Sequence, residues 1–218
     1  MTRRPRLLTT AAAGATAALL LTACGGGTND TKSNDKIDGA ETAPVTPASP
    51  SASVPAPADR PKIELPADVK LTFTPETTGD AVKDAILADN AQLLRALNAA
   101  IVAQNPRLPA LEYYTEGEGA VAAQDWVQSF KKVGWTVTGT VRYFDRQVNV
   151  ESTNKASLSY CGDESKGFNK VIKTGEVKKT EATKDSYVAY GVQVAKNDKG
   201  VWQLVKISST RGVERCQP

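Results

Sequence analysis

The chain has 218 residues and no histidine, and this absence narrows the chemistry that its side chains can perform. Serine and cysteine nucleophiles of hydrolases are commonly activated by an imidazole base, and zinc sites commonly use imidazole ligands. The single methionine is Met1, so a chain that has lost its first residues has no thioether ligand either. We therefore predict no catalytic residues of these classes, no metal site and no cofactor.

Three short motifs match the signatures of serine acyl-enzymes but stand too close together. Ser129 to Lys132 fits S-x-x-K, Ser152 to Asn154 fits S-x-N, and Lys173 to Gly175 spells K-T-G. About twenty residues separate consecutive motifs, which is too few to build the large regions that bring such residues together. The two lysines that end the first motif also suit the C-terminal end of a helix dipole. We expect no acyl-enzyme chemistry.

The N-terminus has the order of an export signal that ends in a lipid-attachment site. Three arginines precede an apolar stretch, Leu7 to Leu21, which is shorter than the roughly 20 residues that span a bilayer. Leu21-Thr22-Ala23-Cys24 then resembles a bacterial lipobox, in which the cysteine is acylated. We expect residues 1–23 to be a lipoprotein signal peptide, with palmitate on Cys24 anchoring the protein at the extracytoplasmic face of the cell membrane. An ordinary cleaved signal and an uncleaved membrane helix are the alternatives.

The basic character of the chain belongs to this signal. The whole sequence has 27 basic and 24 acidic residues, and residues 1–23 contain three arginines and no acid. Removing them leaves 27 − 3 = 24 basic against 24 acidic residues, a formally neutral mature chain. No run of lysines and arginines is interleaved with aromatic residues, so no nucleic-acid partner is expected.

Residues 24–66 have the composition of a disordered tether. They consist largely of Gly, Ser, Thr, Pro, Ala, Asn and Asp, and such a segment cannot bury enough apolar surface to offset its ordering entropy. Proline-rich stretches within it favour an extended chain. The remaining residues, 67–218, suit one domain with a normal core.

Two segments of this domain have the apolar spacing of amphipathic helices. The first begins at Thr78 or Asp80, either of which can cap a helix, and ends before Asn105-Pro106. The second runs from residue 120 to 133, with Gly134 as its C-cap. The apolar face of the second helix comprises Ala123, Trp126, Val127, Phe130 and Val133. We expect that face to pack on a sheet.

The apolar period changes from helical to two after Gly134, which predicts strands. Segments 135–144, 147–151 and 156–160 alternate in this way. The clearest pair is 187–195 and 201–209, joined by a glycine-containing loop that suits a hairpin. Helices followed by such a meander predict an α+β domain, with helices packed on one face of a curved antiparallel sheet.

This order of elements resembles the NTF2-like fold, and more narrowly the lipid-anchored NTF2-like proteins of high-GC Gram-positive bacteria. The resemblance covers about residues 78–218 and rests on Lys132-Val133-Gly134, Gly139, Cys161-Gly162-Asp163, Gly200-Val201-Trp202-Gln203-Leu204 and Cys216. It implies an NTF2-like cone preceded by the signal peptide and tether. Proteins of this fold include enzymes, binding modules and scaffolds, so the fold implies no activity.

Cys161 and Cys216 are the two thiols left once Cys24 is acylated. Disulfides form and persist outside the cytoplasm, so we expect a structural bridge that holds the C-terminal tail against the sheet. A reactive thiol pair is the alternative, although the Cys-x-x-Cys spacing that lowers a thiol pKa is missing.

The resemblance also implies where a site would lie. NTF2-like isomerases and dehydratases place an acid and tyrosine hydroxyls inside the cone, and Asp125 with the tyrosines of the strands would supply them here. The alternative is that each tyrosine packs its ring on the sheet. The residues expected in a pocket or core are Trp126, Phe130, Tyr143, Tyr160, Tyr190 and Trp202.

Our leading hypothesis is a non-catalytic, lipid-anchored lipoprotein whose domain binds a small apolar ligand in the cone or an envelope protein across its sheet. One alternative is a lipid-anchored isomerase or dehydratase, and another is an accessory subunit of a cell-envelope complex. Buried carboxylates or tyrosines converging in a cavity would favour the enzyme. A filled core with an exposed apolar sheet face would favour a protein partner.

Overall fold

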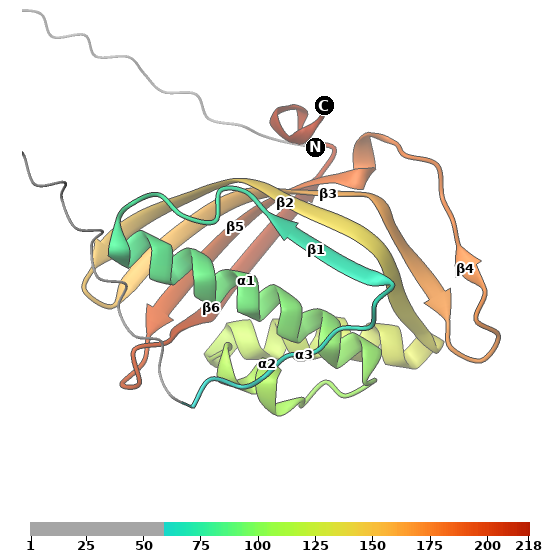
Figure 1. Ribbon diagram of the computed structural model, residues 1–218, viewed down its shortest axis with the longest axis horizontal. Coiled ribbons are helices and arrows are strands. Elements are labelled where there is room, and N and C mark those ends of the chain that lie inside the picture. Colours follow the sequence, from blue (N-terminus) through green and yellow to red (C-terminus); the bar gives the residue numbers. More distant parts are fainter. Residues whose placement is uncertain (1–58) are drawn as a thin grey trace, which may run out of the picture. The chain divides into compact units, whose positions relative to one another are not determined.

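A curved sheet covered on one face by three helices makes up residues 59–218, the part of the chain that the computed structural model describes (Figure 1). The predicted signal peptide, Cys24 and residues 25–58 lie outside the described residues. The helices are α1 (Ala81–Val102), α2 (Pro109–Tyr113) and α3 (Gly117–Val133). The strands are β1 (Val69–Phe73), β2 (Trp135–Ser152), β3 (Lys155–Val171), β4 (Val177–Lys178), β5 (Tyr187–Lys196) and β6 (Trp202–Arg211). None of the described helices is long and apolar enough to cross a membrane.

The two long helices begin and end close to where their caps predict. The carboxylate of Asp80 accepts hydrogen bonds from the backbone N–H groups of Val82 and Lys83 at 2.9 and 3.0 Å, so it caps α1. Gly134 ends α3 with a φ of 70°, a left-handed conformation that glycine adopts readily. The short helix α2 was not predicted, because five residues are too few to show a helical period.

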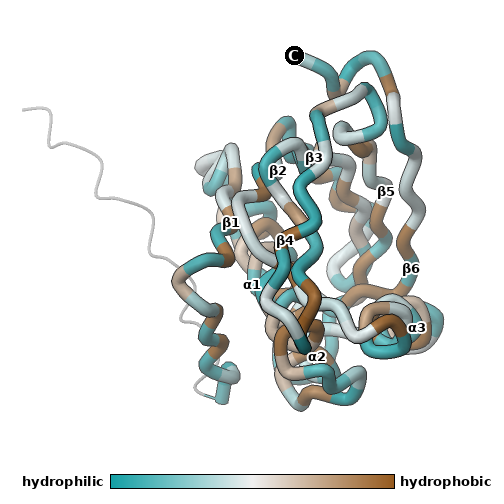
Figure 2. The backbone as a smooth tube through the Cα atoms, turned by 90° about the vertical axis from the view of Figure 1, so that its right-hand side faces the viewer, coloured by the Kyte–Doolittle hydropathy of each residue, from teal (hydrophilic) through white to brown (hydrophobic). Residues whose placement is uncertain are grey.

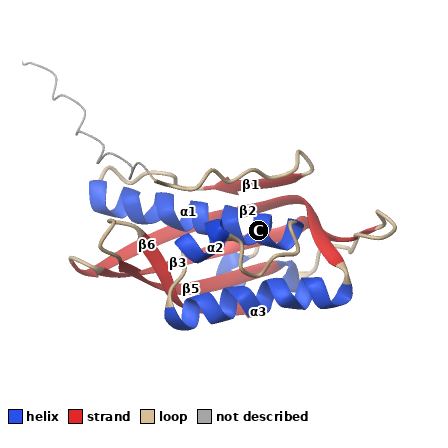
Figure 3. Ribbon diagram, turned by 90° about the horizontal axis from the view of Figure 1, so that it is seen from below, coloured by secondary structure: helices blue, strands red, loops and turns tan. Residues whose placement is uncertain are grey.

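The sheet confirms the predicted meander but has one parallel strand in addition. Its order is β1-β2-β3-β5-β6, with β4 pairing with β3. β1 runs parallel to β2, whereas the other pairs are antiparallel, so the prediction of a purely antiparallel sheet was wrong. A parallel neighbour needs a long crossover, and the three helices supply it. Figure 3 looks onto this crossover, with the helices in front of the strands.

The curvature of the sheet arises in its two longest strands. β2 and β3 have 18 and 17 residues, and their pairing register shifts at three places along their length. One shift lies between Phe144 and Gln147, where Asp145 has a φ of 49°. Such bulges bend a strand and increase its twist, so β2 and β3 arch over the helices in Figure 1.

The core lies between the concave face of the sheet and the helices. The hydropathy colours in Figure 2 change repeatedly along β5 and β6, as expected for strands with one buried face. Trp202, Tyr160 and Tyr143 are buried as predicted, and Phe130 and Tyr190 are partly buried and pack against the core. Three helices on one face of a curved sheet give the predicted α+β class.

Trp126 does not belong to this core, which corrects the prediction. It is 49% exposed, and its ring meets only Phe130 among the described aromatic rings, at a centroid distance of 5.5 Å. The reason is the close approach of α3 to β6 at Gly119, where a Cβ atom would lie 2.3 Å from the carbonyl oxygen of Leu204. Gly119 and Ala123 face the sheet and let α3 pack closely against it. Trp126 lies to one side of this contact, where its indole is exposed to solvent.

Residues 59–66, which we call the N-terminal strap, were predicted to be tether but lie against the domain. Arg60 pairs with Asp89 of α1, and Ile63 packs on the core. These residues read Asp-Arg-Pro-Lys-Ile-Glu-Leu-Pro and differ in composition from the rest of the predicted tether. The boundary predicted at residue 66 therefore lies too far along the chain.

The disulfide between Cys161 and Cys216 is present, with a Cα–Cα distance of 5.4 Å. Cys161 lies on β3 and Cys216 in the short 3-10 turn Glu214–Cys216, and both are fully buried. The bridge therefore holds the C-terminal turn against β3, as predicted.

Candidate functional site

Three tyrosines from adjacent strands gather on the concave face. Tyr160 of β3 lies directly opposite Tyr190 of β5, and their rings stack with centroids 5.0 Å apart. Tyr143 of β2 approaches both rings, at 5.9 Å from Tyr160 and 6.5 Å from Tyr190. The fold therefore brings together Tyr143, Tyr160 and Tyr190, which the sequence analysis had selected as pocket or core residues.

The acid beside these tyrosines is Glu164, which the sequence analysis missed. The hydroxyl of Tyr190 donates to Oε1 of Glu164 at 3.0 Å, and Nη1 of Arg211 donates to Oε2 at 2.9 Å. Continued alternation along β3 from Tyr160 would have placed Glu164 on the same face, but the predicted strand ended at residue 160. Both carboxylate oxygens are thus held by protein groups.

Burial keeps the phenols of this cluster protonated. It raises the pKa of Tyr160 to about 12. Burial is also the largest cause that raises the pKa of Tyr143 and of Tyr190 far above the ordinary value, and the charge of Glu164 adds to the rise. At neutral pH these hydroxyls can donate hydrogen bonds but cannot serve as bases.

The acid proposed from the resemblance, Asp125, does not lie inside the cone. It is exposed on α3, on the side away from the buried Ala123 and Val127. Its position beside Trp126 was taken to face the interior, and Trp126 itself is exposed. Asp125 is therefore not the buried acid that an isomerase-type mechanism needs.

The interior also contains the charged side chain of Arg146, which forms hydrogen bonds mainly to backbone carbonyl groups. Arg146 of β2 is 3% exposed and donates to the carbonyl oxygens of Leu87 at 2.6 Å and Pro75 at 3.0 Å, and to Oδ1 of Asn90 at 3.1 Å. Burial lowers the pKa of Arg146 to about 10, so the guanidinium stays charged at neutral pH. The Tyr160 hydroxyl beside this network is buried and lies near the Asn90 amide, but it makes no hydrogen bond of good geometry to a described residue.

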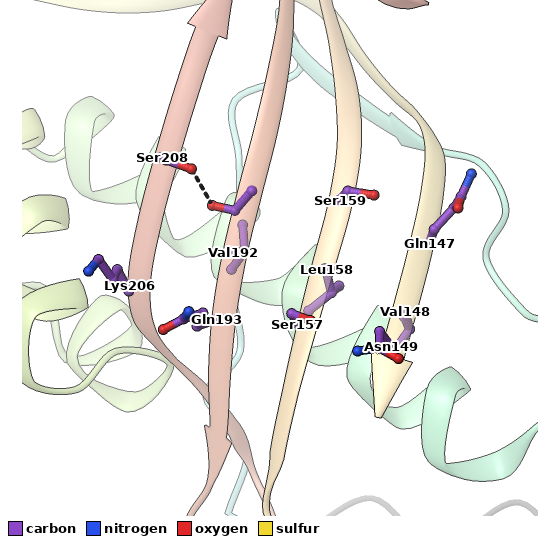
Figure 4. Close-up of a pocket in the computed structure, with 11 residues that line it drawn as sticks. Gln147, Val148, Asn149, Ser157, Leu158, Ser159, Val192, Gln193, Lys206 and Ser208 are labelled. Carbon is purple, nitrogen blue, oxygen red and sulfur yellow. Dashed lines mark hydrogen bonds between the residues drawn. The ribbon is translucent and has the colours of Figure 1, made fainter. Parts of the chain in front are cut away.

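A hollow of about 460 Å³ lies on the opposite, outer face of the sheet. Figure 4 shows its residues on four neighbouring strands, β2, β3, β5 and β6, with the helices behind them. Alternation along the strands explains the orientation, because Leu158 and Val192 point into the core and their neighbours point out. The side chains that face outward are Gln147, Asn149, Ser157, Ser159, Gln193, Lys206 and Ser208.

The lining of this hollow, which we call the outer hollow, is suited to hydrogen bonding. It offers three amides, three hydroxyls and one ammonium group, and amides and hydroxyls both donate and accept. Gln147 donates to Asp145 at 2.8 Å, and Ser208 donates to the carbonyl oxygen of Gly191 at 3.3 Å. The other five polar side chains have no hydrogen bond to a described residue. The outer face of the sheet is polar at this hollow, so it is not the exposed apolar face that would have favoured a protein partner.

No three His, Cys, Asp or Glu side chains within residues 59–218 gather as ligands of a metal ion would. Finding the outer hollow from sequence would have required the register of four strands. The only sequence signal was the polar residue at every second position of each strand, which is also the pattern of an ordinary solvated face.

Neither a family model nor a curated protein matches this chain. Similar solved structures include a ketosteroid isomerase-like protein from Erwinia carotovora atroseptica SCRI1043, 17% identical over 58% of this chain and 93% of that one, with a TM-score of 0.39. A domain of unknown function with a cystatin-like fold from Nostoc punctiforme PCC 73102 is 18% identical over 63% and 80%, with a TM-score of 0.39. An NTF-2 like protein of unknown function from Shewanella oneidensis MR-1 is 14% identical over 56% and 96%, with a TM-score of 0.34. At these identities the neighbours indicate no activity or ligand for this chain.

Proposed function

We propose that this protein is a lipid-anchored, surface-exposed lipoprotein whose domain is a non-catalytic binding module. Its anchor is Cys24 and its ligand or partner binds at the outer hollow. The buried disulfide supports an extracytoplasmic site, because such bonds persist in oxidising compartments. The lipobox pattern at the end of the signal supports attachment to the membrane.

The single observation that carries the proposal is a group of polar side chains that face solvent together and have no protein partner. Five polar side chains of the outer hollow have no protein partner, and the hollow is an open concavity of about 460 Å³. The concave face is instead packed with core side chains. A ligand or partner with several hydrogen-bonding groups fits the outer hollow, and Lys206, its one charged residue, favours a group with a partial or full negative charge.

The enzyme alternative has weaker support. The isomerase or dehydratase type needs a buried acid that can exchange a proton, with donors aimed at the same substrate atom. Glu164 is held by Arg211 and Tyr190, and Asp125 is exposed. An accessory subunit of an envelope complex is compatible with the same surface, since a subunit also binds by its exposed groups.

A photo-crosslinking residue at position 193, in the outer hollow, tests the proposal in the lipidated protein in intact cells. Gln128 is the matched control, because it is also an exposed glutamine but lies on α3. We expect an adduct from position 193 and none from position 128. Intact mass of the adduct separates a small ligand from an envelope protein.

The double variant Asn149→Ala/Lys206→Glu should reduce the yield of the adduct from position 193 severalfold without changing the amount of protein. Equal crosslinking from both positions, or an adduct that is unaffected by the double variant, would contradict the assignment of the binding surface. Loss of catalytic turnover in Tyr190→Phe, with the adduct from position 193 unchanged, would instead support the enzyme alternative.

A further inference from the structure

The N-terminal strap lies on the domain without forming a helix or a strand. Asp59 is at the surface, where it accepts hydrogen bonds from Nζ of Lys199 at 2.8 Å and from the hydroxyl of Tyr113 at 3.2 Å. Arg60 turns inward instead and reaches Asp89 of α1. One side chain of the strap therefore enters the domain, while its neighbour stays at the rim.

Asp89 is a buried carboxylate with two occupied oxygens. Its side chain has no exposed surface. Oδ2 accepts the backbone N–H of Trp202 at 2.9 Å, and Oδ1 is paired with Nη1 of Arg60. The same nitrogen of Arg60 lies 3.3 Å from the hydroxyl of Tyr114, which is itself 1% exposed. A carboxylate and a phenol thus converge on one guanidinium nitrogen.

Arg60 is the only cation among the described residues that pairs with Asp89. A carboxylate taken out of water needs such a partner, because its hydration is lost on burial. Burial alone would lower the pKa of Arg60, but the hydrogen bond and charge of Asp89 raise it above the ordinary value. The arginine side chain is 22% exposed, so the site opens to solvent along the side chain that fills it.

The rest of the strap is held weakly. Lys62 and Glu64 pair with each other at exposed positions, and the Asp59–Lys199 pair is exposed as well. Exposed pairs contribute little to stability, since water screens them. Ile63 is only partly buried. Arg60 is therefore the one residue of the strap that pairs with a fully buried charge, while Pro61, Ile63 and Leu65 add partly buried contacts.

We propose that Asp89 and Tyr114 form a guanidinium-binding site that Arg60 fills in cis. When the strap lifts, the same site binds a guanidinium group supplied from outside, such as an arginine side chain of another polypeptide. Asp89 also accepts the N–H of Trp202, the first residue of β6, so a guanidinium in the site pairs with a carboxylate that is bonded to this strand. The inference goes beyond the proposed function and does not depend on it.

Methylguanidinium binding to the Arg60→Ala variant of the full chain tests this site. We expect the variant to melt on the order of 5–10 °C lower than the wild type, because a buried carboxylate loses its partner. Methylguanidinium should restore most of that loss and saturate, with NMR shifts at the Trp202 amide. The wild type should bind methylguanidinium with the same shift at the Trp202 amide but at least tenfold more weakly, since the strap must lift and Arg60 competes for the site. Lys62→Ala removes a cation from an exposed position of the same strap and is the matched control.

Two further samples make each outcome decisive. Arg60→Ala/Asp89→Asn should bind no methylguanidinium, and tetramethylammonium, a cation without N–H donors, should not replace it. If Arg60→Ala does not fold by itself, methylguanidinium should restore its folded spectrum and tetramethylammonium should not. Equal binding to wild type and Arg60→Ala, binding that survives Asp89→Asn, or no recovery with methylguanidinium would overturn the proposal.

Discussion

Replacing Tyr160 by phenylalanine should leave the protein equally stable or make it more stable. Its hydroxyl is buried near Asn90 without a hydrogen bond of good geometry, and a buried polar group left unsatisfied costs about 1–3 kcal/mol. Phenylalanine keeps the ring and its stacking on Tyr190 but removes that cost. We expect the free energy of unfolding to rise by between zero and about 1 kcal/mol, which raises Tm by between zero and roughly 4 °C for a domain of this size.

Tyr190→Phe is the matched variant, because it removes a hydroxyl that is bonded. Tyr190 donates to Glu164 at 3.0 Å, and a hydrogen bond to a charged group contributes about 1.5–3 kcal/mol. Partial exposure places the expected loss at the lower end of that range. Both values follow from urea unfolding of the oxidised protein at neutral pH. A loss above about 1 kcal/mol in Tyr160→Phe, or no loss in Tyr190→Phe, would refute the reasoning.

Three other predictions concern the anchor, the bridge and the core. Cys24→Ala should abolish metabolic labelling with palmitate and release the protein from the membrane, and a normally acylated variant would contradict the lipobox. Non-reducing peptide mapping should find Cys161 joined to Cys216, and Cys216→Ser should lower the free energy of unfolding by up to about 4 kcal/mol, whereas free thiols in the exported protein would exclude the bridge. Trp126→Ala should cost less than about 1 kcal/mol and Leu204→Ala about 2–5 kcal/mol, as measured by urea unfolding, and the reverse order would mean that α3 packs by its other flank.

Local patterns in the sequence were sufficient for the long elements of the fold. The caps at Asp80 and Gly134 and the alternation of β5 and β6 are signals carried by neighbouring residues. Strand β1 has only five residues, and its partner Gly139 follows Val69 by seventy positions, so nothing near it indicates a parallel pair. Such a pairing depends on the crossover that the three helices make.

The candidate site was predictable only in part, for a related reason. The three tyrosines face the core because they share the period of their strands. The direction of α3 depends instead on how closely Gly119 approaches Leu204, which a helical pattern does not contain. Trp126 and Asp125 were therefore placed inside although both are exposed. The buried ion pair of Arg60 and Asp89 joins residues 29 positions apart, and composition alone assigned one of them to the tether.

The interior charges bear on the proposal of a binding module. Catalysis requires charged groups that are buried yet free to act on a substrate, whereas a buried charge is stable only when protein groups satisfy it. Here Arg146 binds the backbone of Leu87, and Asp89 binds the backbone of Trp202. Each contact joins α1 to the sheet, so neither group can turn to a substrate without loosening that joint. The polar side chains of the outer hollow do not connect α1 to the sheet. A ligand can therefore bind them without breaking a contact between these two elements.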